Sequence, residues 1–292
     1  LPSLSLSESN RFIFELVVSG APALVARFGS TELRAIRRHF LRSEEGLIEK
    51  IRGLLIEGRM PFFSRFENRR LFLNSGFYPV DPQTVRRFSM LIRASLPRVD
   101  LLGSWAPGEA FFSEELKQAR VTRLGNLEPF FAKNPWTYGL AGKRVLVIHP
   151  FARTIRTQYE NARELLFQNP GILPSFDLDT LTAVQSRGST DGRFRTWFDA
   201  LEWMRGETLR RNFDVALVGC GAYGLPLAAM VKEEGRTAIH LGGATQLLFG
   251  IKGARWDQRE SIRALYNNYW VRPSEDEVPA GARGVDGRIP YS

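Results

Sequence analysis

Short apolar runs alternate with amphipathic segments along most of the chain. The continuous apolar character of buried strands is found at residues 23–28, 99–105, 144–149, 179–185, 215–218 and 237–241. The helical period predicts helices at residues 31–40, 43–57, 80–95, 154–167, 193–211 and 225–234. Strands that alternate with helices are typical of a mostly parallel sheet with helices on both faces. The sequence therefore predicts an α/β fold of this kind.

No linker separates the two halves of this pattern, although they differ in regularity. Residues 1–142 hold the longer loops, residues 143–270 form the more regular half, and residues 271–292 are an irregular tail. The chain has 292 residues and is 43% hydrophobic, which is enough to bury a large core. We therefore expect a single α/β domain, residues 1–292, with two lobes and a tail that wraps the surface.

The net charge of +9 arises from 40 Lys and Arg residues against 31 Asp and Glu residues. This balance favours phosphate-rich ligands, anionic membrane surfaces or nucleic acid, and it also fits a solvated, arginine-rich surface. The basic residues do not alternate with aromatic residues in a recognisable nucleic-acid module, so a nucleic-acid partner is not expected. The densest basic groups are Arg34, Arg37 and Arg38, then Arg69 and Arg70, then Arg86 and Arg87.

The single cysteine, Cys220, excludes an internal disulfide and a cysteine-rich zinc site. No apolar run approaches the roughly 20 residues that span a bilayer. The first residues also lack the basic start and apolar stretch of a signal peptide. We therefore expect a cytoplasmic protein, and the positive charge adds the expectation of contact with the inner face of the membrane.

Gly219, Gly221 and Gly224 form a Gly-x-Gly-x-x-Gly motif between a predicted strand and a predicted helix. Glycines in this context let the chain turn with positive φ and let a phosphate approach the amides of a helix N-terminus. Three interpretations are open: a dinucleotide site, a site for another phosphate or a sugar, and a tight turn without a ligand. The next strand ends in Gly242 and Gly243, without the acid that usually binds the ribose of NAD, which disfavours a dinucleotide.

A second candidate site is Arg27-Phe28-Gly29-Ser30-Thr31-Glu32, which follows the first predicted strand and opens a helix. The arginine can bind a diphosphate through paired N–H donors. Glu32 can hold a divalent metal, remove a proton from an acceptor hydroxyl, or only stabilise the helix N-terminus. Ligands of open parallel sheets bind at the carboxyl ends of the strands. We therefore expect this motif, His149 and the two glycine clusters to form one crevice.

Further polar and aromatic residues are candidates for the same crevice. His149 can donate to a phosphate, act as a base, or be a buried histidine bonded to the backbone. Trp105 can stack on a sugar ring while Glu109 orients a hydroxyl, or both can lie in a plain surface loop. Tyr223, inside the glycine loop, is predicted to contact the substrate, and Lys252 can reach a diphosphate or cap a helix. Arg255 and Trp256 have the same two alternatives as Lys252, Gln185 and Ser186 are candidates for the border of the cleft, and His240 is expected to be structural.

The stretch LVARFGSTELRAI resembles the Arg-Phe-Gly-Asp-x-Glu opening of bacterial glycosyltransferases with the GT-D-type fold. Three later stretches are similar to a subgroup of these enzymes from surface-polysaccharide loci. They are KRVLVIHPFARTIRTQYENARELLF, LVGCGAYGLPLAAMVKEEGRTAIHLGGATQLLFGIKGARWD and LYNNYWVRPSEDEVP. The resemblance extends from about residue 20 to residue 279, and the long C-terminal motif is its more specific part.

This resemblance implies a Rossmann-like α/β fold and the transfer of a sugar from a nucleotide diphosphate sugar. In the family, an Asp-x-Glu motif contacts a divalent metal, Mn²⁺ or Mg²⁺, and the nucleotide diphosphate. The glutamate corresponds to Glu32, but the aspartate position is Ser30, whose hydroxyl is a poor substitute for a carboxylate on a metal. A metal at Glu32 and neutralisation of the leaving diphosphate by Arg27 and Lys252 are therefore alternatives.

Three hypotheses follow from these patterns. The main one is a glycosyltransferase of surface-polysaccharide biosynthesis, which transfers a sugar from a nucleotide diphosphate sugar to a glycan, lipid-linked or protein acceptor. The second, motivated by Ser30, is a catalytically degenerate member of the fold that binds a glycan or a partner protein. The third is an NAD-linked oxidoreductase, motivated by the glycine spacing alone.

Overall fold

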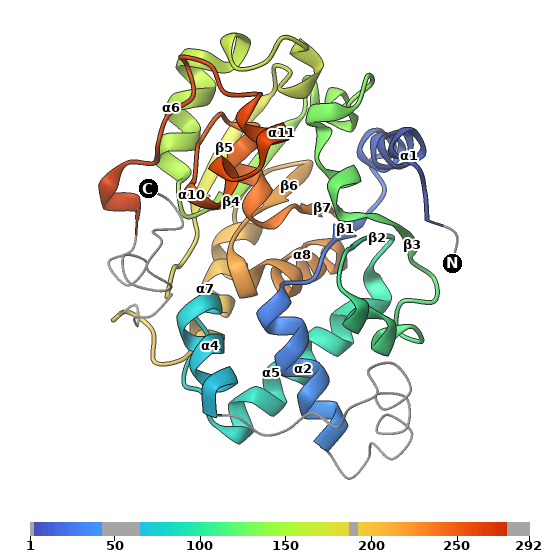
Figure 1. Cartoon of the computed structure of the whole chain (residues 1–292), viewed down its shortest axis with the longest axis vertical. Helices are drawn as coiled ribbons and strands as arrows, with labels where there is room; N and C mark the ends of the chain where they lie inside the picture. Colours follow the sequence, from blue (N-terminus) through green and yellow to red (C-terminus); the bar gives the residue numbers. More distant parts are fainter. Residues whose placement is uncertain (1–2, 43–64, 187–191, 279–292) are drawn as a thin grey trace.

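Seven parallel strands form one sheet in the computed structural model of the chain, which describes residues 3–42, 65–186 and 192–278 (Figure 1). The strand order is β3-β2-β1-β7-β6-β4-β5. The strands are β1 (Leu24–Ala26), β2 (Leu101–Ser104), β3 (Arg120–Arg123), β4 (Arg144–His149), β5 (Asp177–Thr182), β6 (Val215–Val218) and β7 (Thr237–His240). The longer helices are α1 (Leu6–Ser19), α2 (Ser30–Arg42), α4 (Arg65–Ser75), α5 (Pro82–Ser95), α6 (Ala152–Ala162), α7 (Trp197–Leu209) and α8 (Gly224–Glu233). Three short helices follow: α9 (Thr245–Leu248), α10 (Ala254–Asp257) and α11 (Glu260–Arg263). The predicted Rossmann-like α/β fold is confirmed.

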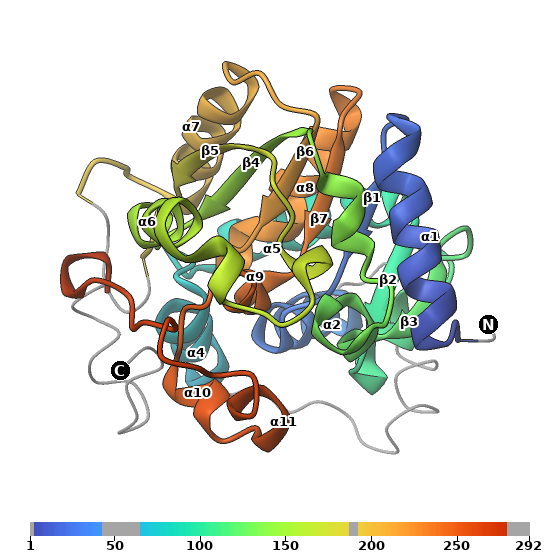
Figure 2. The ribbon, with the colours of Figure 1, turned by 90° about the horizontal axis from the view of Figure 1, so that it is seen from above.

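Both faces of the sheet are apolar, because alternate residues of each strand point to opposite sides. In β4, Leu146 and Ile148 belong to one hydrophobic core, whereas Val145 and Val147 belong to the other. The first core contains side chains of α2, α5, α7 and α8, and the second contains side chains of α1, α6 and the three short helices. Helices accordingly flank the sheet on both sides in Figure 2. The result is a three-layer arrangement that leaves the carboxyl ends of the strands open to loops.

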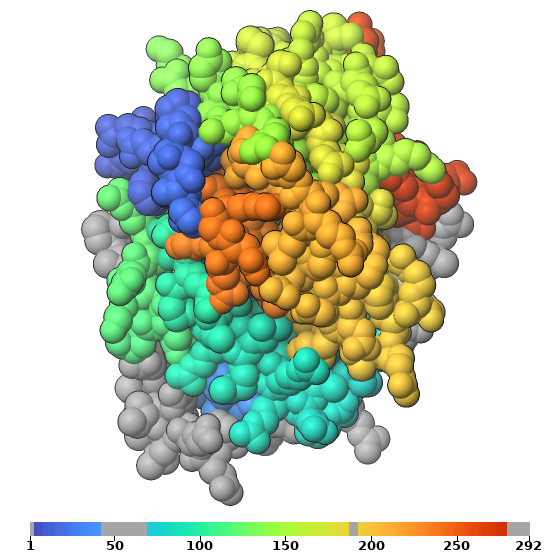
Figure 3. Space-filling model, turned by 180° about the vertical axis from the view of Figure 1, so that it is seen from behind, coloured from blue at the N-terminus to red at the C-terminus, as the bar shows by residue number. Residues whose placement is uncertain are grey.

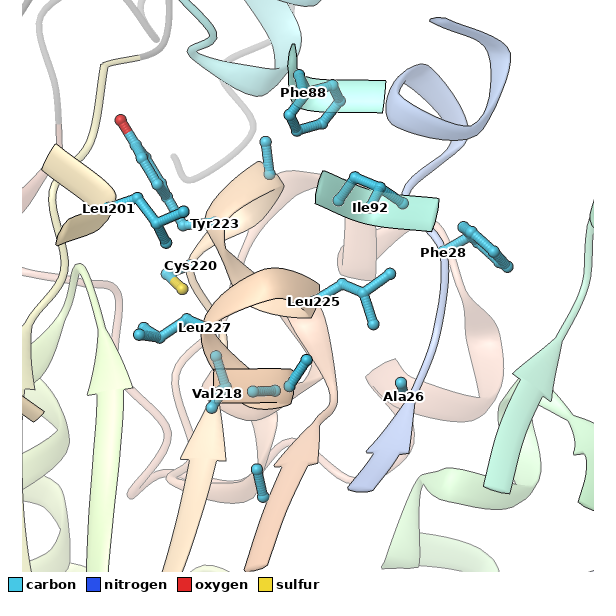
Figure 4. Close-up of a cluster of buried hydrophobic side chains, with 14 of the residues drawn as sticks. Ala26, Phe28, Phe88, Ile92, Leu201, Val218, Cys220, Tyr223, Leu225 and Leu227 are labelled. Carbon is cyan, nitrogen blue, oxygen red and sulfur yellow. The ribbon is translucent and has the colours of Figure 1, made fainter. Parts of the chain in front are cut away.

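Helix α8 is held between the sheet and α5 by close apolar packing. Figure 4 shows Leu225 and Leu227 on opposite sides of α8, with Leu225 on the side of Ile92 of α5, and both leucines belong to one apolar cluster with Ile92 and Val218. Burying a side chain of this size contributes about 1.5–3 kcal/mol relative to leaving it exposed. The helix that follows the glycine motif therefore has a fixed position, and so does the loop before it.

Strands from both halves of the chain lie in the single sheet, because β1 pairs with β7. Leu24 is aligned with Ala238 and Val25 with Ile239. On the face seen in Figure 3, the blue N-terminal helix adjoins orange residues from the C-terminal half, and teal residues of the first half adjoin them below. Among the described helices, none is both long enough and apolar enough to cross a bilayer.

The predicted elements need several corrections, among them the helices predicted at residues 154–167 and 193–211, which are α6 at residues 152–162 and α7 at residues 197–209. The structure adds α1, α4 and the edge strand β3, none of which was predicted. Strand β5 covers residues 177–182 rather than 179–185, because Ala183 and Val184 are buried in the loop beyond it and continue the apolar run. The helix predicted at residues 43–57 lies outside the described residues.

Candidate functional site

A cleft of about 410 Å³ opens where the carboxyl ends of β1, β7, β6 and β4 meet. Strand β4 lies between β5 and β6 in the sheet. After β4 the chain continues to β5 on one side of it, whereas after β6 the chain continues to β7, in the opposite direction across the sheet. Such a switch point is where open α/β sheets bind ligands, and the volume is in the range of small-molecule sites. The predicted residues that line this cleft are Arg27, Gly29, Ser30, Glu32, Trp105, His149, Gly219, Gly221, Tyr223, Gly242 and Gly243. The expected single crevice is therefore present.

Two predicted binding residues, Phe28 and Lys252, lie outside the cleft wall. The Phe28 ring is buried and stacks on Phe112, with 5.9 Å between the ring centroids. The Lys252 ammonium lies 5.5 Å from the ring centroid of Tyr266, in a cation–π contact. The cation that reaches the cleft from this segment is Arg255. The choice of Lys252 over Arg255 is corrected accordingly.

Glu109 is also absent from the cleft wall, and its contacts are structural. Its carboxylate accepts hydrogen bonds from the Ser104 hydroxyl and from the backbone N–H groups of Trp105 and Ala106. Burial raises the pKa of this carboxyl group. The bonds fix the turn that carries Trp105, whose indole N–H donates to the Phe28 carbonyl at 3.1 Å. Glu109 therefore contributes to the cleft through the position of Trp105 and through its negative charge near Arg27.

Each position of the Gly-x-Gly-x-x-Gly motif requires glycine for a different structural reason. A side chain at Gly219 would lie 2.8 Å from the carbonyl oxygen of Gly242, so the first glycine permits close approach of two strand ends. Gly221 has a φ of +59°, which favours glycine. A side chain at Gly224 would lie 2.1 Å from Cε1 of His240, a buried residue of the cleft wall, whereas Gly224 itself is not among the lining residues. Gly224 is therefore a packing residue, and the predicted ligand contact at this position is corrected.

Replacing Gly224 by alanine is expected to destabilise the fold by about 1–3 kcal/mol, because the new methyl group overlaps the buried His240 ring. Gly206 in α7 is a matched control, since a methyl group there meets no atom within 4 Å. Gly206→Ala is expected to stabilise the fold by about 0.5–1 kcal/mol through helix propensity. Urea unfolding of both variants measures the difference, and equal stabilities would contradict the packing explanation.

Two guanidinium groups, called here the arginine pair, lie over Gly242 and Gly243. A side chain at Gly242 would lie 2.9 Å from a terminal nitrogen of Arg27, and one at Gly243 would overlap the Arg255 guanidinium. Burial lowers the pKa of the Arg27 guanidinium, and the carboxylates of Glu32, Glu109 and Glu128 act in the opposite direction. The arginine pair can therefore meet an anion at a strand end where no side chain blocks the backbone.

Three buried polar atoms of the cleft wall have no hydrogen-bond partner within the described residues. They are Nε of Arg27, Oγ of Ser75 and Oε1 of Gln185. Buried polar groups in folded proteins are normally paired, and an unpaired one costs about 1–3 kcal/mol. The cleft wall therefore holds three buried polar atoms that the described residues leave unsatisfied. Ser75, at the end of α4, was not predicted from the sequence.

His149 is placed to donate a hydrogen bond rather than to act as a base. Its Nδ1 accepts a bond from the backbone N–H of Phe151 at 3.0 Å, so the proton of the neutral ring is on Nε2. Burial, together with the nearby Arg255, lowers the pKa of His149 to about 3. At neutral pH, the Nε2–H group is therefore a donor at the cleft wall, which favours the phosphate-contact interpretation of His149.

His240 and Cys220 line the cleft without being available for proton transfer. The Nδ1 of His240 lies 3.1 Å from the carbonyl oxygen of Val218 and must donate to it, as expected for a structural histidine. Burial, with the charge of Arg27, lowers the pKa of His240 to about 4. Burial raises the pKa of Cys220 to about 12, so its thiol is not ionised at neutral pH.

Glu32 is the only carboxylate among the described residues of the cleft wall. It lies in the first turn of α2, and its Oε2 is 1.9 Å from where a side chain on Gly29 would begin. Within the described ranges, no three His, Cys, Asp or Glu residues are grouped to hold a metal. One carboxylate beside two guanidinium groups is a poor ligand set for Mn²⁺ or Mg²⁺. These residues do not fit a metal held by the protein alone.

The N-terminus of α6, although close to His149, is already occupied by the C-terminal segment. The carboxylate of Glu277 accepts hydrogen bonds from the backbone N–H groups of Arg153 at 2.8 Å and Thr154 at 3.2 Å. Arg153 also forms an ion pair with Asp276. The described part of the tail therefore packs on α6 and caps it.

Comparison of the chain with profiles of known protein families, with curated proteins and with solved structures found no match. The function is therefore inferred from the cleft and from the resemblance of the sequence motifs.

Proposed function

We propose that the protein is a glycosyltransferase that uses a nucleotide diphosphate sugar as the donor. The observation that carries the proposal is the arginine pair over Gly242 and Gly243, with Nε of Arg27 buried and unpaired among the described residues. Paired N–H donors of arginine match the oxygen atoms of a diphosphate, and the glycines leave room for its close approach. The family resemblance of residues 20–279 independently supports this donor class.

In the proposed reaction, an acceptor hydroxyl forms a bond to C1 of the donor sugar while the bond from C1 to the diphosphate oxygen breaks. The arginine pair balances the charge on the leaving diphosphate, which is the role that a metal has in related enzymes. Glu32 accepts the proton of the acceptor hydroxyl. His149 donates from Nε2 to a phosphate or sugar oxygen. Trp105, 45% exposed at the cleft wall, stacks on the sugar ring.

For the acceptor, the arginine-rich helices favour a lipid-linked molecule at the inner face of a membrane. Helix α2 contacts both α4 and α5, so the fold gathers the three basic groups of the sequence in one region (Figure 1). The exposed arginines of this region are Arg34, Arg69, Arg86 and Arg87. Such a surface is attracted to anionic lipids. Glycan and protein acceptors are the alternatives within the same proposal.

Titration calorimetry with UDP, GDP, CMP and dTDP, with and without Mn²⁺, tests the donor site. Arg27→Met and Arg255→Met are each expected to weaken binding of the preferred nucleotide about ten- to one-hundredfold, because each removes charge-assisted hydrogen bonds. Arg11→Met, at an exposed position on α1, is the matched control and is expected to bind as the unmodified protein does. If no nucleotide binds at millimolar concentration, the proposal is wrong.

A further inference from the structure

The main cleft has a charged end and an uncharged end. The strands along its rim follow the order β2-β1-β7-β6-β4-β5. Its charged side chains, Arg27, Glu32 and Arg255, lie over the glycines that follow β1 and β7. In the described chain, the wall beyond β5 and at the end of α4 consists of uncharged residues alone. This part of the wall, called here the amide end, is formed by Asn74, Ser75, Val184, Gln185 and Ser186.

The wall is continuous from the arginine pair to the amide end. A side chain at Gly242 would lie 2.9 Å from a terminal nitrogen of Arg27. One at Gly219 would lie 2.8 Å from the Gly242 carbonyl oxygen and 2.7 Å from Cδ2 of His149. The His149 carbonyl then accepts a hydrogen bond from the backbone N–H of Ala183, which leads into the amide end. Strands β7 and β5 are three positions apart, about 14 Å at the usual spacing. A ligand bound at the arginine pair can therefore extend past His149 to the amide end.

Two carboxamides of the amide end form no hydrogen bond within the described residues. They belong to Asn74, in the last turn of α4, and to Gln185, in the loop after β5, and both residues are half-buried. The Oε1 atom of Gln185 is buried, so the part of this amide that is accessible is its NH₂ group. A carboxamide offers hydrogen bonds without a charge. The amide end therefore suits hydroxyl, carbonyl or ring-nitrogen atoms better than it suits a phosphate.

Hydrogen bonds hold the two segments of the amide end together and join them to the glycine loop. The Ser186 hydroxyl donates to the Gly76 carbonyl at 2.6 Å and lies 3.1 Å from the Tyr223 hydroxyl. A hydroxyl has one proton to donate, so Tyr223 is the donor in the second bond. The Tyr223 ring in turn stacks on Trp197, with 4.7 Å between the ring centroids. The amide end is therefore a fixed wall that needs no rearrangement to meet a ligand.

We propose that the amide end binds the nucleoside of the donor nucleotide, an inference that rests on the proposed function. Glu32 and Trp105, the residues proposed for the transfer step, lie at the ends of β1 and β2, on the opposite side of the arginine pair. The sugar and its acceptor occupy that side, and the diphosphate lies at the arginine pair. The part of the donor that extends the other way is the uncharged nucleoside. Its ribose hydroxyls and its base match the carboxamides of Asn74 and Gln185.

Calorimetry with inorganic pyrophosphate, UDP, CDP, GDP and ADP tests this assignment. The preferred nucleoside diphosphate is expected to bind at least about tenfold more tightly than pyrophosphate. Gln185→Met and Asn74→Leu nearly keep the size of each side chain and remove its hydrogen-bonding groups. Each variant is expected to weaken binding of the preferred nucleotide about three- to tenfold and to leave pyrophosphate binding unchanged.

Matched controls are Gln83→Met on α5 and Asn161→Leu on α6, at exposed positions outside the cleft, and both are expected to bind as the unmodified protein does. The two cleft variants change different segments, and retained pyrophosphate binding shows that each is folded. Three results would overturn the assignment and leave the diphosphate site in place: equal affinities for pyrophosphate and every nucleotide, unchanged nucleotide affinity in both variants, or equal losses for both ligands. Failure of pyrophosphate and every nucleotide to bind would instead remove the proposed function, and this assignment with it.

Discussion

Replacing Glu32 by glutamine is expected to lower the rate of sugar transfer about 10²- to 10⁴-fold, while the affinity for the nucleotide changes little. Glutamine has nearly the same size and keeps one hydrogen-bonding oxygen, but it cannot accept the proton of the acceptor hydroxyl. Glu32 is the only carboxylate among the described cleft residues, so no neighbouring acid in this set replaces it. Initial rates of nucleoside diphosphate release with saturating donor measure the effect.

The matched control for this experiment is Glu15→Gln on α1, where the carboxylate is exposed and its partner is Arg11. This control is expected to keep the full transfer rate. A Glu32→Gln enzyme with an unchanged rate would show that Glu32 is not the base. If the unmodified protein binds nucleotides but transfers no sugar to any acceptor, the result favours the degenerate binding protein that Ser30 suggests.

Acidification is expected to destabilise the fold by about 3 kcal/mol per pH unit below about pH 6.5, because two buried histidines stay neutral in the folded state. The pKa of His149 is lowered to about 3 and that of His240 to about 4, against about 6.5 in an unfolded chain. Between these values, the unfolded state binds a proton at each histidine and the folded state does not. The stability is therefore fully present above about pH 6.5 and is lost as the pH falls toward 4.

Urea unfolding between about pH 7 and pH 5 measures this slope, in a range where most carboxylates stay ionised. His149→Gln and His240→Gln are each expected to remove about half of the pH dependence, whatever their effect on stability at neutral pH. A free energy of unfolding that stays constant over this range would show that both rings accept protons in the folded protein.

The buried strands were predictable because continuous apolar runs are their direct signature, as in residues 144–149. Strand β3 was not predicted, because Arg120-Val-Thr-Arg123 lies at the edge of the sheet and only Thr122 is fully buried. Helix α1 did carry a local signal, a capping box between Ser5 and Glu8, which hydrophobic periodicity does not report. Hydrophobic periodicity alone therefore does not predict a strand at the edge of the sheet or a helix whose main signal is its N-terminal cap.

At the candidate site, the rule that ligands bind at strand ends predicted which segments meet, but not which side chains reach the cleft. Lys252 and Arg255 are three positions apart in the sequence, and only the turn into α10 determines that the arginine lies over Gly243. Ser75 belongs to a helix that was not predicted, so its place in the wall had no sequence signal. Long side chains and helix packing depend on tertiary contacts that a single sequence does not display.

The position of β1 in the middle of the sheet has a consequence for how the chain folds as the ribosome makes it. Among the seven described strands, β1 is synthesised first, yet one of its two neighbours, β7, is synthesised last. Leu24 and Val25 cannot complete their pairing until Ala238 and Ile239, more than 200 residues later in the sequence, have been made. Strand β1 therefore keeps one unpaired apolar edge until β7 is made, the condition under which nascent chains depend on chaperones.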